Sequence, residues 1–218
     1  IYPIVMGWQW GGGWLAEIGF SDFAGSTLVH STGGAAALAG IMILGPRYGR
    51  FTKAGVPTPI KPFAASSIPL VTIGVFVLWL GWFGFNGGSQ LALGSFADAV
   101  SISTIFINTN LAACGGVLAA AVITRLMFGK TDVVQMLNGA IGGLVAITAE
   151  PLAPSPLSAI LIGAVGGVIV VFGTKLLFSY KLDDVVGAIP AHLFSGIWGT
   201  LAVPLTNSDA TFSAQLIG

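Results

Sequence analysis

Six long apolar segments, joined by short connections, dominate this 218-residue chain. Their approximate bounds are 22–45, 66–88, 101–127, 133–149, 157–179 and 185–204. A helix needs about 20 apolar residues to cross a bilayer, and lipid forces the backbone to pair internally. Charged residues make up 7% of the chain, against about 25% in soluble domains. The sequence therefore predicts an all-α membrane protein, a polytopic helical bundle.

The basic residues indicate how this bundle is oriented. All of them fall on alternate connections, and they are Arg47, Arg50, Lys53, Lys61, Arg125, Lys130, Lys175 and Lys181. Lysine and arginine concentrate on the cytoplasmic side of membrane proteins. The pattern predicts that the connection 46–65 is cytoplasmic and that the N-terminal end of the chain lies outside the cell membrane. A missed span would break the alternation, so the pattern also supports six spans.

Both histidines of the chain lie inside apolar segments, where an ionisable ring is costly and usually faces a pathway. His30 lies eight residues after Asp22 (30 − 22), and His192 lies eight residues after Asp184 (192 − 184). Each ring is therefore about 12 Å inward from its own end of a core about 30 Å thick. Because the two segments run in opposite directions, the rings are expected to meet near the midplane, as in inverted repeats. Two unrelated structural histidines are the alternative.

The sequence lacks the motifs that are typical of several other classes of protein. Cys114 stands alone in an apolar run, and no His, Cys and carboxylate cluster suggests a metal site. Ser195 lies in LFSG, which lacks the first glycine of the G-x-S-G motif of an intramembrane serine protease. No basic-aromatic or phosphate-binding pattern suggests nucleic acid or nucleotide. We expect a protein that is not an enzyme, has no cofactor and binds no nucleic acid.

Three segments resemble signatures of the ammonium transporter family, the relatives of Rhesus proteins. They are WGGGWLAEIGFSDFAGSTLVHSTGGAAALAGIMILGPR (10–47), WFGFNGGS (82–89) and DDVVGAIPAHLFSGIWG (183–199). The resemblance covers the whole chain and implies one ammonium transporter domain, 1–218, truncated at both ends. It implies the fifth to tenth of about eleven helices, part of a fold with two inverted repeats of five helices. It also implies a homotrimer with one pore per subunit.

The resemblance assigns roles to residues that match its motifs. His30 and His192 resemble twin pore histidines, which would take part in proton transfer and conduct ammonia. Trp10 and Ser89 resemble an outer recruitment site for ammonium. Phe85 resembles an aromatic gate, and the second gate phenylalanine would lie outside this chain.

Two further residues have weaker or structural assignments. Trp82 resembles a pore-side, substrate-binding residue, and Asp22 resembles an acid that organises the outer end of its helix. Some members carry a second acid where Gly187 stands here. For Trp10, an interfacial aromatic belt is the alternative, and for Phe85 it is ordinary packing.

The chemistry of these residues suits ammonium transport. A cation over an aromatic face gains about 0.5–2 kcal/mol, whereas an unpaired ion in an apolar pore costs tens of kcal/mol. We therefore expect ammonium to be recruited outside, deprotonated and conducted as ammonia past the histidines. An ammonium sensor or receptor on the same fold and a passive ammonia gas channel are the alternatives. Besides the lipid bilayer, the resemblance implies a PII-type regulatory protein as a partner at the cytoplasmic face.

Overall fold

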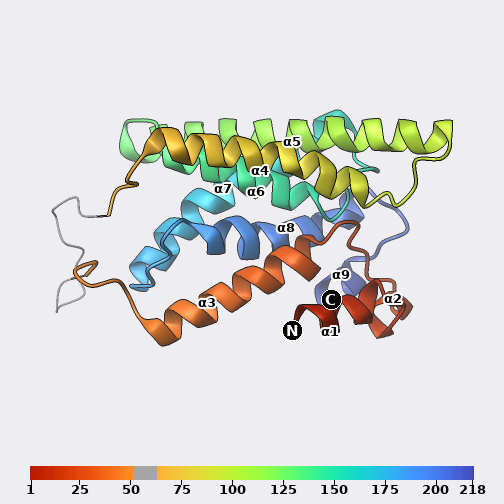
Figure 1. Ribbon diagram of the computed structural model, residues 1–218, viewed down its shortest axis with the longest axis horizontal. Coiled ribbons are helices and arrows are strands. Elements are labelled where there is room, and N and C mark those ends of the chain that lie inside the picture. Colours follow the sequence, from red (N-terminus) through yellow and green to blue (C-terminus); the bar gives the residue numbers. More distant parts are fainter. Residues whose placement is uncertain (52–62) are drawn as a thin grey trace.

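The computed structural model describes residues 1–51 and 63–218, and its elements are helices of different lengths (Figure 1). Their bounds are α1 Tyr2–Gln9, α2 Trp14–Glu17, η1 Ser26–Ser31, α3 Thr32–Leu44, α4 Ile68–Gly88, α5 Phe96–Phe128, α6 Val133–Ile147, α7 Pro156–Ser179, η2 Ile189–Phe194, α8 Ser195–Ala202, η3 Val203–Leu205 and α9 Phe212–Ile217. The predicted all-α fold is confirmed.

All six predicted segments are helical. Four helical runs are long and apolar enough to cross a membrane: Ser26–Leu44, Ile68–Gly88, Phe96–Phe128 and Pro156–Ser179. Two shorter apolar helices, Val133–Ile147 and Ile189–Leu205, correspond to the fourth and sixth segments. Helices α4 and α5 lie along the long axis of the molecule, with α3 inclined to them (Figure 1).

Helix α5 begins earlier than the sequence predicts, at Phe96 rather than residue 101. The reason is a capping box: the Ser95 hydroxyl accepts a hydrogen bond from the Asp98 N–H at 3.1 Å. The Asp98 carboxylate in turn accepts from the Ser95 N–H at 3.0 Å. Because both free N–H groups are satisfied, the helix can start well before its apolar stretch. With 33 residues it is about 50 Å long.

Helices α5, α6 and α7 pack closely because glycines line their contacts. A Cβ atom added at Gly163 would overlap the backbone oxygen of Ala112, and one at Gly116 would overlap that of Gly139. A Cβ at Gly167 would likewise overlap the backbone of Gly116. Small residues at these positions allow the backbones to approach, as in other membrane bundles. The broken helix η2–α8 packs against α6 and α7, and the broken helix η1–α3 packs mainly against η2–α8.

An ion pair joins the end of α3 to the turn before η2. Arg47 holds Asp183 through Nε at 2.7 Å, Nη2 at 2.8 Å and its backbone N–H at 3.0 Å. Arg50 Nε lies 3.2 Å from Asp183 Oδ1, the oxygen that also accepts from Arg47 Nη2, and the Asp183 side chain is 1% exposed. The predicted cytoplasmic residues Lys53 and Lys61 lie outside the described residues.

This ion pair predicts a pH-dependent stability. The hydrogen bonds from Arg47 hold the pKa of Asp183 below its ordinary value. Its contribution is therefore present above the ordinary carboxyl pKa and is lost as pH falls through the lowered pKa. We expect Asp183→Asn to cost about 1–2 kcal/mol at neutral pH, between an exposed and a buried pair, since Arg47 is 38% exposed. Melting in detergent across pH should show the two proteins converging in acid. A constant difference at every pH would contradict this expectation.

Candidate functional site

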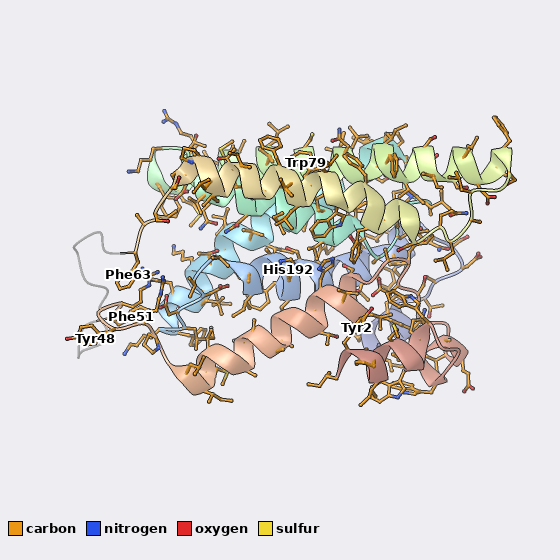
Figure 2. All side chains as sticks on the ribbon, in the orientation of Figure 1. Tyr2, Tyr48, Phe51, Phe63, Trp79 and His192 are labelled. Atoms are coloured by element: carbon orange, nitrogen blue, oxygen red, sulfur yellow. The ribbon has the colours of Figure 1, made fainter. Side chains whose placement is uncertain are left out.

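His30 and His192 meet in the interior of the bundle. Their Nδ1 atoms are 3.2 Å apart, and their ring centroids are 5.2 Å apart at an interplanar angle of 26°. Figure 2 shows His192 near the middle of the long axis. A hydrogen bond between two Nδ1 atoms needs one donor and one acceptor, so the neutral rings adopt complementary tautomers. One ring carries its proton on Nδ1 and the other on Nε2. We call these two rings the histidine pair.

The first histidine is placed by a buried aspartate. Asp22 Oδ1 accepts from the N–H groups of Gly25 and Ser26, both at 2.9 Å. Its Oδ2 accepts from Thr27 at 2.8 Å and from Leu28 at 3.0 Å. These are the free N–H groups at the start of the π-helical turn η1, which the carboxylate satisfies and whose dipole it complements.

The second histidine is placed in the same manner. Asp184 Oδ1 accepts from the N–H groups of Gly187 at 3.1 Å and Ala188 at 3.0 Å. Its Oδ2 accepts from Ile189 at 2.7 Å, at the start of the π-helical turn η2. The equal spacing from aspartate to histidine therefore corresponds to equal local structure in the two segments.

The two histidine segments also share glycines that our sequence analysis did not detect. Aligned on their aspartates, both read D-x2-G-x4-H-x3-G. A Cβ at Gly34 would lie 2.6 Å from the backbone N of Leu193, and one at Gly196 would overlap the Ser31 hydroxyl. Leu193 and Ser31 each follow a histidine, so the close contacts are reciprocal. Aligning the two segments on their aspartates would have revealed this repeat.

Aromatic side chains of α4 cover His30. Trp82 is 6% exposed and stacks on the His30 ring, with centroids 4.9 Å apart at 18°. Phe85, one turn further along α4, lies 5.3 Å from His30 and is 38% exposed. His30 Nε2 is buried and has no hydrogen-bond partner within the described part of the chain. The edge of the histidine pair is therefore apolar, with Phe85 at its open side.

The two residues predicted for outer recruitment are anchored separately. Trp10, which follows α1 and is 42% exposed, donates its indole N–H to the Asp22 carbonyl oxygen at 2.8 Å. Ser89, at the end of α4, donates its hydroxyl to the Phe85 carbonyl oxygen at 2.8 Å. Because that proton is used, the Ser89 oxygen keeps lone pairs that can accept an N–H donor. Trp10 is thus tied to the turn before η1, which carries His30, and Ser89 is tied to α4, which carries Trp82 and Phe85.

The described residues hold no group of three or more His, Cys, Asp and Glu side chains that could bind a metal ion. The polar groups beside the path include the imidazole nitrogens of the histidine pair and the Ser89 hydroxyl. Such groups can exchange hydrogen bonds with a small N–H donor and acceptor as it moves between them.

Comparisons with known proteins agree on one family. The model of the Ammonium Transporter Family matches residues 1–216. The chain is 46% identical over 222 residues to a putative ammonium transporter of Synechocystis sp., covering 100% of this chain and 49% of that protein. It is 46% identical over 213 residues to the ammonium transporter Amt2 of Archaeoglobus fulgidus, covering 93% and 44%.

Solved structures are similar over the whole chain. A structure described as Sensor Amt Protein has a TM-score of 0.90 at 34% identity and covers 99% of this chain and 56% of that chain. The structure of Candida albicans Mep2 has a TM-score of 0.83 at 32% identity, covering 100% and 46%. The chain spans about half the length of the curated relatives it matches.

Proposed function

This chain belongs to the ammonium transporter family, and we propose that it forms part of a pore that carries ammonium across a membrane as ammonia. One observation carries the proposal: the Nδ1 atoms of two imidazole rings from opposite helical segments lie 3.2 Å apart, with the aromatic rings of Trp82 and Phe85 against His30. A neutral pore that offers one donor and one acceptor in series suits ammonia, which is both a donor and an acceptor. It does not suit a bare cation, which would lose its hydration there.

The proposed path begins at the outer mouth. Trp10 offers an aromatic face to the ammonium cation, and the lone pairs of the Ser89 oxygen accept one of its N–H groups. Ammonium gives its proton to water at the exposed outer mouth before the nitrogen passes Phe85, because the neutral form costs far less to desolvate. Ammonia then moves along the histidine pair, exchanging hydrogen bonds with successive ring nitrogens.

Transport by the intact protein tests this proposal. Reconstituted in liposomes, it should give saturable uptake of methylammonium that ammonium inhibits, with no uptake of potassium. A current that follows an ammonium gradient would identify an electrogenic carrier, and uptake without current would identify a passive ammonia channel. Absence of uptake would contradict the proposed function.

An ammonium sensor is the second candidate function. It is favoured by the likeness to a structure described as Sensor Amt Protein, at a TM-score of 0.90. A sensor would bind ammonium at the outer mouth without turnover. Calorimetric binding of ammonium to a protein that shows no uptake would therefore support this candidate.

We propose that the protein lies in the cell membrane with the connection 46–65 in the cytoplasm and the N-terminal end of this chain outside. With Cys114 replaced by alanine, we expect Ser213→Cys to react with an impermeant maleimide in intact cells. Lys130→Cys should react only after permeabilisation. The reverse pattern would overturn this orientation.

The family resemblance makes a PII-type regulator the proposed partner of the cytoplasmic face, which co-purification tests.

We also propose a homotrimer in which α5 contacts another subunit. Asn110 is exposed two residues before the midpoint of α5 (112, from 96 and 128). An amide facing lipid at that depth is unfavourable, whereas it can hydrogen-bond across a helix interface for about 0.6–2 kcal/mol. We expect trimers by native mass spectrometry, and Asn110→Leu should lower their dissociation temperature. An unchanged dissociation temperature would exclude Asn110 from the interface.

A further inference from the structure

Four buried polar side chains from three helices form a chain of hydrogen bonds beside the histidine pair. The Trp82 indole N–H donates to the Thr148 hydroxyl at 2.9 Å. That hydroxyl in turn shares its proton between the Leu144 carbonyl oxygen at 2.7 Å and Asn86 Oδ1 at 3.2 Å. The Asn86 amide donates to the Thr109 hydroxyl at 2.9 Å. Asn86, Thr109 and Thr148 have no exposed surface. Such a network is expensive to bury, so every member holds its neighbours in one geometry.

Thr148 lies at the centre of this network and also contacts the segment that carries His30. Its carbonyl oxygen accepts from the Ala24 N–H at 3.1 Å, and the carbonyl of Ala149 accepts from Phe23 at 2.8 Å. Phe23 and Ala24 form the turn between Asp22 and η1. Thr148 therefore joins both the start of the His30 helix and the tryptophan that covers the His30 ring.

The plane of the His30 ring depends on that tryptophan. His30 has one polar restraint, the Nδ1 contact with His192, because its Nε2 is buried without a partner in the described part of the chain. A ring held at one atom can tilt about it. The stacked indole of Trp82, at 4.9 Å and 18°, opposes this tilt.

We infer that Thr148 is a positioning residue, which holds Trp82 against His30 and so fixes the ring plane along which ammonia passes. This inference rests on the proposed function. Without the hydroxyl, the Trp82 N–H and Asn86 Oδ1 would be buried and unpaired, and the indole would shift toward another partner. Small displacements of positioned groups reduce rates strongly. The side chains of Trp10 and Ser89 bond to the backbone carbonyls of Asp22 and Phe85 and not to the Thr148 hydroxyl, so we expect recruitment of ammonium to be unchanged.

Three single variants of the intact protein in liposomes test the inference. Thr148→Val should lower the maximal rate of methylammonium uptake about tenfold and leave the half-saturating concentration unchanged. Thr148→Ser keeps the hydroxyl and should restore most of the rate. The matched control is Thr124→Val. Thr124 is also fully buried, and like Thr148 it donates its hydroxyl to a carbonyl of its own helix, Ala120 at 2.7 Å. Its hydroxyl accepts from the Asp132 N–H and not from a tryptophan, so Thr124→Val should transport normally.

A double variant separates positioning from general damage. Trp82→Phe keeps an aromatic ring but has no N–H, so adding Thr148→Val should cause little further loss. Equal losses from Thr148→Val in both backgrounds, or a wild-type rate in the single variant, would overturn the inference. An unmodified protein that carries no methylammonium would instead overturn the proposed function itself. The two failures are therefore distinguishable.

Discussion

Replacing either His30 or His192 by alanine is expected to abolish selective ammonium transport, with uptake falling at least about a hundredfold. Each ring supplies the Nδ1 partner of the other at 3.2 Å. In either variant the remaining ring loses that partner, and the path loses a donor and an acceptor. The measurement is methylammonium uptake into liposomes that contain the purified variant, compared with the unmodified protein at equal protein content.

Two controls accompany this experiment. The melting temperature in detergent shows that each variant is folded, and a potassium flux assay shows whether the cavity left by the ring admits a hydrated ion. Uptake at the original rate by both variants, with potassium still excluded, would mean that the histidine pair has no part in conduction.

Replacing Asp22 by alanine is expected to prevent stable folding. Its carboxylate accepts four backbone N–H groups at 2.8–3.0 Å and is 2% exposed. Each buried N–H without a partner costs about 1–3 kcal/mol, so four of them cost about 4–12 kcal/mol, which is comparable to the whole stability of a typical domain, about 5–15 kcal/mol. We expect loss of the melting transition in detergent and strongly reduced yield from the membrane fraction.

Glu17→Ala is the matched control, because Glu17 is an exposed acid at the same end of the molecule. It should melt like the unmodified protein. An Asp22→Ala protein with an unchanged melting temperature would show that water or another group replaces the carboxylate, and the proposed organising role of Asp22 would be lost.

Much of this fold could be predicted because the relevant signals are local. Apolar length predicts where the helices lie, and four of the six predicted segments contain helical runs long enough to cross a membrane. The meeting of His30 and His192 also follows from local information, because equal spacing from Asp22 and Asp184 gives equal depth. The start of α5 was wrong by five residues (101 − 96) because a capping box outweighed hydropathy.

The remaining features depend on contacts between distant segments. Thr148 is one threonine among many in the sequence, and its importance arises only where α4 and α6 bring it to Trp82 and Asn86. Gly34 resembles any other small residue of an apolar helix until Leu193 is placed against it. The roles proposed for Trp10, Ser89 and Phe85 came from the family resemblance and not from a local sequence signal.

The reciprocal contacts between the two broken helices constrain any attempt to widen this pore for bulkier amines. Gly34 touches the residue after His192, and Gly196 touches the residue after His30. Displacing one imidazole together with its segment therefore also changes the contact of that segment with the opposite glycine. A redesign for a larger substrate must alter both half-helices together, as a matched pair of substitutions.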